Sequence, residues 1–357
     1  MKSKNIFSKN ELLANIQSPK LLFTLSTDDM TEQLNLNPKV SLNIFSQRDD
    51  CLKKAHEQID EARKRDVKII DRYSVGYPTL LKEIADDPVV LYVKGELILD
   101  NRKMLSIVGT RCATHYGIEQ TAKIVSGLAT SHICIVSGLA LGIDTEAHKN
   151  AIDNGLPTIA VLGNGLDMIY PPTNKILAQK ILDSGGAIIS EMPFNTPMGQ
   201  WLFPRRNRII AGMTHATLVV EASVRGGALI TAARANDYNR TVFAIAGRSD
   251  APFSQGCNAF IKNNKAMLIE NAEDILNSMG WDISTKNSKQ HSVYASNLPE
   301  KEIEILEIID AEKPCSLDLI FEKTNFAIPE ILSILTKLEV GGFIKEIPGC
   351  MYESVRR

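Results

Sequence analysis

The 357-residue chain lacks three features that would place it in a membrane or in an oxidising compartment. No apolar run approaches the ~18–20 residues that span a bilayer. The N-terminal sequence MKSKNIFSKNELLANI is charged and polar, without the apolar segment of a secretion signal. The six cysteines are scattered and form no C-x-x-C pair, which argues against a disulfide framework and a zinc site. We expect a cytoplasmic protein with no membrane contact and no bound metal.

An overall positive charge is also missing, because the net charge is −2. The charge is unevenly distributed, however. Residues 101–275 carry 16 Lys and Arg against 13 Asp and Glu, a net of +3, whereas residues 296–357 carry 7 against 12, a net of −5. A polyanion is attracted to the first segment and repelled by the second. Any phosphate-binding face is therefore expected in the middle of the chain.

The middle of the chain alternates short β-branched runs with helical patterns. Strands are predicted at Leu105–Gly109, Ile133–Ser137, Thr158–Leu162, Ala187–Ser190, Thr217–Glu221, Thr241–Ile245 and Ala266–Ile269. The first two begin 28 residues apart, close to the ~30 of a βαβ unit. Continuous apolar strands between helices indicate a mostly parallel sheet covered on both sides. We predict an α/β, Rossmann-like doubly wound domain over residues 66–280, in which Asp66–Asn101 adds a strand and a lead-in.

The N-terminal part of the chain has a different pattern. Residues 1–65 predict a small helical domain of the SAM or helix-hairpin-helix kind. Its clearest element is a charged helix from Arg48 to Arg65 with one apolar face formed by Leu52, Ala55, Ile59 and Ala62. A packing role and a binding role are equally compatible with this pattern.

Residues 281–297 are polar and predict a linker, and residues 298–357 predict a winged helix-turn-helix. Helices are expected at Glu302–Asp310, Ser316–Lys323 and Ile328–Val340, and hairpin strands at Phe343–Ile347 and Met351–Ser354. Such folds commonly place the third helix in the major groove. Here that helix, IPEILSILTKLEV, lacks the Arg, Asn and Gln side chains that read bases. We favour a protein-contact or regulatory role for it, with DNA binding as the alternative.

Glycine-containing loops follow several of the central strands. Gly109, Thr110 and Arg111 follow the first strand, Ser137 and Gly138 the second, Gly163 the third, and Gly226 and Gly227 the strand that ends at Glu221. Ligands bind at this edge of an open α/β sheet. Glycine lets a phosphate approach the free N–H groups of a helix start, and an arginine can pair with it bidentately. Each loop alone is weak evidence, but together they predict a phosphate-binding edge.

One further segment adds an aromatic ring and a cluster of cations. In the run from Phe203 to Arg208, Pro204 suits the first turn of a helix and three arginines fall within four residues. Aromatic stacking beside cations holds single strands without strong sequence preference, at ~1–3 kcal/mol per stacked base. Alternatively, Phe203 lies in the core and one or two arginines form ion pairs, for example with Glu221. We expect this second interpretation to hold for at least one arginine.

Six motifs, in order, resemble the DNA-processing protein A family (DprA, also called Smf). They are SIVGTRCATHYG, SGLALGIDTEAH, GNGLDMIYPPTN, FPRRNRIIAG, VVEASVRGGALITAARA and GCNAFIKNNKAMLIENAEDIL, between about Tyr77 and Leu276. The acidic C-terminal segment is similar to the winged helix of many members. The resemblance implies a non-enzymatic Rossmann-fold protein that binds single-stranded DNA, dimerises through that domain and needs no cofactor. It also implies loading of the RecA recombinase during natural transformation.

The resemblance also implies roles for individual residues. Arg111 matches the DNA-pairing arginine of the family, Phe203 matches its aromatic position, and Arg206–Arg208 match its RNR segment. Many members have Ser-Gly-Ser where this chain has Gly226-Gly227-Ala228, so only backbone contacts are expected there. The expected DNA contacts are Gly109, Thr110, Arg111, Ser137, Gly138, Gly163, Phe203, Arg205, Arg206, Asn207, Arg208, Gly226 and Gly227.

Two classes of enzyme on related folds are alternatives. A nucleotide phosphoribohydrolase uses a P-G-G-x-G-T-x-x-E loop, but Arg234 stands where the acid would follow Thr231. A dinucleotide-dependent oxidoreductase needs G-x-G-x-x-G, and Gly109 has no such partners. Asp144 and His148 have the i, i+4 spacing of a metal pair without a third ligand, so we expect a helix cap and a packed histidine. Assays for base release from nucleoside monophosphates would separate the first alternative from DNA binding.

Overall fold

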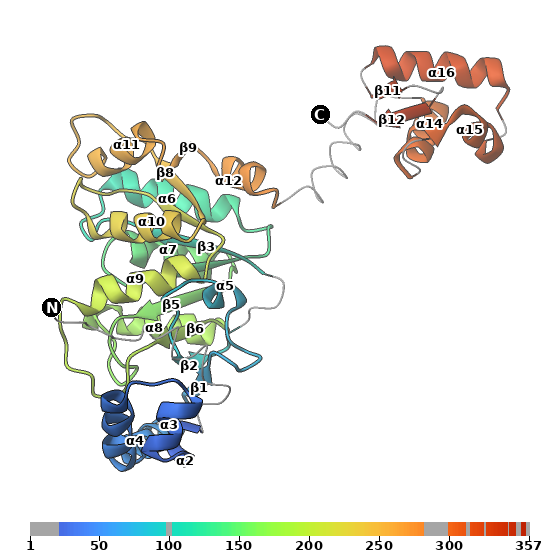
Figure 1. Cartoon of the computed structure of the whole chain (residues 1–357). Coiled ribbons are helices and arrows are strands. Elements are labelled where there is room, and N and C mark those ends of the chain that lie inside the picture. The colour runs from blue at the N-terminus through green and yellow to red at the C-terminus, as the bar shows by residue number, and fades with distance from the viewer. Residues whose placement is uncertain are drawn as a thin grey trace. The chain divides into compact units, whose positions relative to one another are not determined.

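The computed structural model describes residues 21–97, 102–281, 299–311, 315–324, 326–341, 343–347 and 351–354 (Figure 1). The chain divides into two compact units, Met1–Trp281 and Asp282–Arg357. The predicted linker, residues 281–297, lies outside the described residues except for Trp281. Among the described helices, none combines the length and the apolar character that a membrane span requires.

A nine-stranded sheet forms the centre of the first unit, in the order β1-β2-β6-β5-β4-β3-β7-β8-β9. Its strands are β1 (Lys68–Asp71), β2 (Val90–Gly95), β3 (Lys103–Val108), β4 (Ile133–Ser137), β5 (Thr158–Leu162), β6 (Ala187–Ser190), β7 (Ala216–Val219), β8 (Thr241–Ile245) and β9 (Met267–Ile269). In this order, all strands from β6 through β5, β4, β3, β7 and β8 to β9 are parallel to one another. The strands β1 and β2 add an antiparallel edge next to β6. The predicted fold class is therefore confirmed. The segment before β3 contributes two strands where one was predicted.

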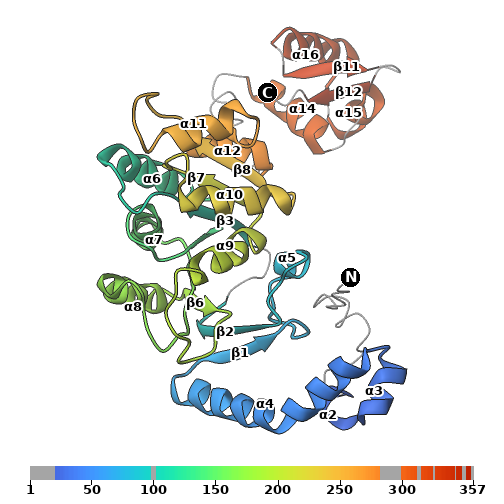
Figure 2. The same cartoon turned by 60° about the vertical axis from the view of Figure 1, so that its left-hand side comes forward.

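Both faces of this sheet are covered by helices (Figure 2). One face carries α5 (Thr79–Lys82), α9 (Leu202–Gly212), α10 (Gly227–Asp237) and α11 (Gln255–Lys262), and the other carries α6 (His115–Gly127), α7 (Ile143–Asp153), α8 (Lys175–Asp183) and α12 (Ala272–Met279). Alternate residues of β3 enter the two cores, with Met104 and Val108 on one side and Leu105 and Ile107 on the other. Every residue of β4 and β5 is buried, which is why these strands are continuous apolar runs.

Three helices precede the sheet: α2 (Leu21–Thr24), α3 (Thr27–Gln33) and α4 (Pro38–Lys64). The helix α4 starts ten residues before the predicted Arg48, because Asn37 caps it and Pro38 occupies its first position. Its predicted apolar face is buried only in part. Leu52 and Ile59 remain 39% exposed, whereas Ala62 packs in a cluster with Tyr92 and Phe194.

The second unit contains α14 (Glu300–Ala311), α15 (Leu317–Lys323) and α16 (Ile328–Val340) with a small sheet of order β10-β12-β11. The hairpin strands β11 (Ile344–Ile347) and β12 (Met351–Ser354) were predicted, whereas β10 (Cys315–Ser316) was not, since two residues give no readable period. The predicted winged helix is confirmed. The turn residues Gly342, Pro348 and Gly349 lie outside the described residues.

His148 fixes α7 to the sheet and should make the fold sensitive to acid. Its buried ring lies 2.7 Å from Thr158 Oγ1, and that hydroxyl donates to the Ile135 carbonyl, so His148 Nδ1 carries the proton. Burial, with Arg206 nearby, lowers the pKa of His148 from 6.5 to about 3. Between about pH 3 and pH 6.5, His148 is therefore protonated in the unfolded chain and neutral in the folded chain.

We predict that this difference lowers the free energy of unfolding by about 2 kcal/mol between pH 7 and pH 5. A His148→Gln variant, whose amide can still donate to Thr158, should lose that part of the pH dependence. Urea unfolding of both proteins at the two pH values measures it. Equal pH slopes in the two proteins would contradict the assignment.

Candidate nucleic-acid interface

A cavity of about 420 Å³ opens at the carboxyl edge of the sheet, beside the ends of β3 and β7. The chain winds outward from β3 through β4, β5 and β6, then returns to β7 on the other side of β3. Ligands of open α/β sheets bind at such a reversal. The structure brings together there eight of the predicted contact residues: Gly109, Thr110, Arg111, Phe203, Arg206, Asn207, Gly226 and Gly227.

Glycine is required where two loops meet beneath this cavity. A Cβ on Gly109 would lie 2.5 Å from the Ile143 side chain, and one on Gly142 would lie 2.3 Å from the Thr110 carbonyl oxygen. Gly142 also has a φ of +78°. This contact lets the Ile143 N–H donate to the Thr110 carbonyl at 3.2 Å. The loop that carries Arg111 is thereby held against the start of α7.

Two positive groups that suit an anion border the cavity, the start of α10 and the side chain of Arg111. The helix α10 starts at the cavity without a side-chain cap, so the positive end of its dipole faces the space. Arg111 is exposed, and its guanidinium lies 5.0 Å from the centre of the Phe203 ring. In the described part of the chain, Arg111 has no ion-pair partner. Its charge is therefore free to pair with a ligand phosphate.

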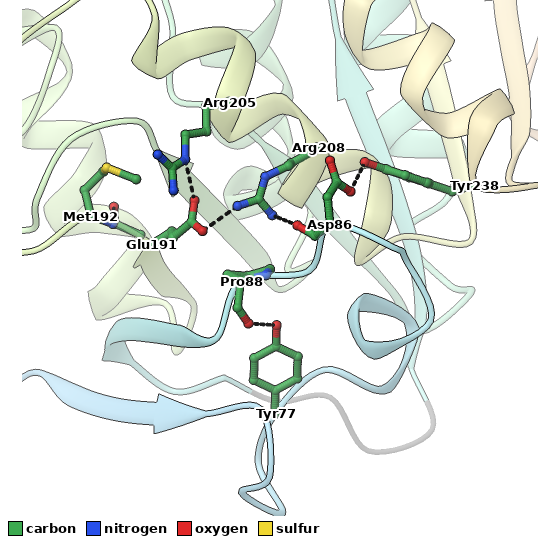
Figure 3. Close-up of polar contacts among 9 residues, drawn as sticks. Tyr77, Asp86, Pro88, Glu191, Met192, Arg205, Arg208 and Tyr238 are labelled. Atoms are coloured by element: carbon green, nitrogen blue, oxygen red, sulfur yellow. Dashed lines mark hydrogen bonds and ion pairs between the residues drawn. The ribbon is translucent and has the colours of Figure 1, made fainter. Parts of the chain in front are cut away.

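Two arginines of α9 pair with a carboxylate, although not with the predicted one (Figure 3). Arg205 and Arg208 both bind Glu191, which follows β6, and Arg208 also donates to the Asp86 carbonyl. The predicted partner, Glu221, instead accepts from the N–H of Thr114 at 3.0 Å. Arg208 is buried by these contacts, whereas the Arg205 side chain remains 49% exposed. Arg205 alone keeps a surface that a ligand can reach.

Arg206 is buried and holds the loop that follows β4 against the end of β5. It donates to the carbonyl of Gly138 at 2.6 Å and to that of Val161. Burial lowers the pKa of Arg206 to about 10 and raises the pKa of Asp144 beside it. The Asp144 carboxylate accepts from the Gly138 N–H at 3.1 Å. A Cβ on Gly138 would lie 2.4 Å from the guanidinium, so a larger residue here would displace the Arg206 side chain.

These contacts change the roles of several residues that were expected to touch DNA. Arg206, Arg208 and Gly138 use their polar atoms inside the protein, and the buried Ser137 hydroxyl donates to the Ile107 carbonyl at 2.6 Å. Gly163 is buried and lines a smaller cavity of about 50 Å³. We assign these five residues to the framework of the site. Their burial could not be inferred from the sequence. Arginine is mostly exposed in proteins, and glycine occurs both in the core and at the surface.

Asn207 has an intermediate position. It lines the large cavity, and its side chain accepts from Arg206 Nε at 3.2 Å and donates weakly to the Gly227 carbonyl at 3.4 Å. It thus links α9 to the start of α10, and it borders the space where a ligand would lie.

Two residues of the GNGLDMIYPPTN motif were not expected in the site. Asn174, at the end of the 3-10 helix η1 (Pro172–Asn174), donates to the Leu139 carbonyl at 2.9 Å. It supports a backbone with a φ of +57° at Leu139, which is strained for a leucine. Tyr170 lies against Phe203, with the ring centres 5.7 Å apart. Tyr170 is the aromatic residue of a motif that matches the family, and its presence there was the signal that could have identified it.

Asp144 and His148 each make contacts within the protein. His148 is packed against Thr158, as expected, and Asp144 caps the Gly138 N–H rather than the start of α7, which begins after Gly142. Among the described residues, no group of three or more His, Cys, Asp or Glu side chains is placed to hold a metal.

The fold defines a Rossmann-like α/β protein that also carries a winged helix. More specifically, the chain belongs to the DNA recombination-mediator protein A family, whose model matches residues 68–280. The model of the DprA winged helix domain matches residues 292–350. The resemblance found in the motifs is therefore confirmed.

Individual relatives give the same result. The chain is 36% identical to protein Smf of Escherichia coli K12, over 81% of this chain and 78% of that protein. It is 40% identical to the DNA processing protein DprA of Streptococcus pneumoniae, over 67% and 82%. The X-ray structure of the pneumococcal protein superposes with a TM-score of 0.63 and 33% identity, over 77% and 97%. A DprA structure from Helicobacter pylori, described for its single-stranded DNA binding mode, superposes with a TM-score of 0.54 and 28% identity, over 60% and 95%.

The different burial of Arg205 and Arg208 predicts different effects on stability. An Arg208→Ala variant leaves Glu191 without its buried partner, so the free energy of unfolding should fall by about 3 kcal/mol. An Arg205→Ala variant removes a half-exposed ion pair and should cost less than about 1 kcal/mol. Urea unfolding followed by circular dichroism measures both. Equal losses in the two variants would contradict the framework role of Arg208.

Proposed function

We propose that this protein binds single-stranded DNA in the large cavity and passes the strand to a RecA-type recombinase. The observation that carries the proposal is the free guanidinium of Arg111, which lies over Phe203 beside the uncapped start of α10. Cation, aromatic face and helix N-terminus are the groups that bind a phosphate and an adjacent base. The Helicobacter pylori relative, described as binding single-stranded DNA, supports the same ligand.

The proposed contacts divide by what each group can supply. Phosphate is bound by the backbone of Gly109 and Gly227, with the Thr110 hydroxyl and the Arg111 side chain, whereas the Gly226 N–H donates to the Ser223 carbonyl at 2.9 Å and shapes the turn. Phe203 stacks on a base, and Asn207 lines the cavity that holds the strand. Arg205 adds a cation at the rim, which it shares with Glu191. Binding of this kind needs no bond to be made or broken, so the proposed function is not enzymatic and uses no cofactor.

We further propose that the protein acts in the cytoplasm as a homodimer, on DNA taken up during natural transformation. The strand β9 is an edge of the sheet, and Met267 and Leu268 on it are 52% and 49% exposed. An unpaired edge with apolar side chains is suited to pairing with a second copy. Light scattering tests this directly: the dimer has twice the 39.4 kDa of one chain, and a monomer mass at micromolar concentration would contradict it.

Removing the Arg111 charge should weaken DNA binding. In an Arg111→Ala variant we expect the affinity for oligothymidylate to fall about tenfold or more, because one phosphate contact is lost. The slope of log K against log salt should become shallower by about 1. Fluorescence anisotropy over a salt series measures both quantities, with duplex DNA of the same length as the weaker ligand.

The matched control is Arg63→Ala, which removes another exposed arginine, this one from α4. It should leave the affinity and the salt slope unchanged. If Arg111→Ala also changes neither, the large cavity is not the DNA site. Delivery to the recombinase is tested separately by ATP hydrolysis of RecA on single strands coated with a single-strand-binding protein. A rate that does not rise when this protein is added would limit its function to binding.

A further inference from the structure

Glu221 is a buried carboxylate with no part in the DNA contacts proposed above. It follows β7 and is 2% exposed, and both of its side-chain oxygens accept from Thr114, the N-cap residue of α6. The Thr114 hydroxyl donates to Oε1 at 2.5 Å, and the Thr114 N–H donates to Oε2 at 3.0 Å. In the described ranges of the chain, no Lys, Arg or His side chain forms an ion pair with Glu221. A negative charge buried in this way needs another source of compensation.

The start of α6 supplies that compensation. The N–H groups and the dipole of this 13-residue helix attract an anion to its first turn. A Cβ on Gly117 would overlap the Glu221 carboxylate, so a glycine in this turn leaves the space that the carboxylate fills. In dinucleotide-binding proteins of this fold class, the helix after the first strand of the parallel sheet binds the pyrophosphate at its start. Glu221 therefore lies where such a ligand would place a phosphate.

Glu221 also fixes the loop that carries Arg111. Its backbone carbonyl accepts from the Thr110 N–H at 2.8 Å, so both ends of residues 110–114 are bound to the same residue. Arg111 lies between these two attachments, and its guanidinium is 5.0 Å from the centre of the Phe203 ring. Loss of the carboxylate would release the Thr114 end of the loop and, with it, the position of Arg111.

We propose that Glu221 is a specificity-determining and positioning residue, whose carboxylate occupies the anion site at the start of α6. It closes this helix start to ligand phosphates, whereas the start of α10 has no side-chain cap and stays open. It also holds Arg111 where a strand can reach it, and this second role rests on the proposed function. The proposal accounts for a negative charge buried beside a site that we assign to a polyanion.

Formate, the smallest carboxylate, tests the anion site without DNA. In a Glu221→Ala variant, formate can enter the vacated space. The gain in melting temperature with formate over chloride, at equal ionic strength, should be about 2–4 °C larger in this variant than in the unmodified protein. A Glu221→Gln variant keeps the space filled and should respond as the unmodified protein does. An equal gain in Glu221→Ala and the unmodified protein would overturn the inference.

Oligothymidylate binding, followed by fluorescence anisotropy, tests the positioning of Arg111. Glu221→Ala should lower the affinity about five- to tenfold, because Arg111 is released, and should cause no further loss in an Arg111→Ala background. Formate should restore the affinity of Glu221→Ala to within about twofold of the unmodified protein, both measured at equal ionic strength. It should leave the affinity of Arg111→Ala unchanged.

Thr121→Val is the matched control, because it removes a buried hydroxyl of α6 that donates to the Gly117 carbonyl at 2.7 Å and leaves the carboxylate in place. It should change neither the affinity nor the response to formate. If Glu221→Ala does not fold, Glu221→Gln carries the comparison of backgrounds, since its amide N–H faces one of the two Thr114 donors.

An equal loss of affinity in the two backgrounds would show that Glu221 acts only on general stability, and would overturn its positioning role. An Arg111→Ala variant that binds oligothymidylate as tightly as the unmodified protein would instead contradict the proposed function. In that case the formate experiment still decides whether Glu221 occupies the anion site of α6.

Discussion

The site depends on one buried cation. Arg206 extends from α9 to the edge of the sheet and donates to the carbonyls of Gly138, which follows β4, and Val161, which lies in β5. Asp144 lies beside it and raises its pKa against the larger effect of burial. A buried guanidinium is tolerated only when its donors are satisfied in this way. The loops around the cavity are therefore held before any ligand arrives.

That arrangement divides neighbouring arginines between two tasks. Arg206 and Arg208 point into the protein and bind carbonyls and Glu191, whereas Arg111 approaches from another loop and pairs with no carboxylate among the residues that the structure describes. The same division explains how a protein with a net charge of −2 can carry the phosphate-binding edge that we propose. Local placement of unpaired charge matters more here than the total. The winged helix lacks such exposed polar groups on its third helix. Ile328 and Leu332 of α16 are apolar and exposed, where a DNA-reading helix carries polar side chains.

The sequence predicted strands accurately where every residue of the strand is buried. The strands β4 and β5 were predicted to the residue, because full burial on both faces makes each an uninterrupted apolar run. The start of α4 was misplaced, because its first ten residues mix apolar and polar side chains and its signal is the cap at Asn37. The strand β10 is too short to have a period.

The site was predictable in position and less so in detail. Strand ends and glycine loops located the edge, but adjacent arginines in one helix look alike in sequence. Whether each turns inward depends on partners 17 to 68 positions away, such as Glu191 and Gly138. Tyr170 was missed for the same reason, because its contact with Phe203 joins residues from separate loops.

Ultraviolet crosslinking of bromodeoxyuridine-substituted single strands, with the crosslinked peptides mapped by mass spectrometry, tests the central claim most directly. Crosslinks should fall in the segments that border the two cavities, at residues 109–111, 170 and 203. They should be absent from α16. Crosslinks confined to the winged helix, or to the opposite edge of the sheet, would show that the strand binds elsewhere and would contradict this account.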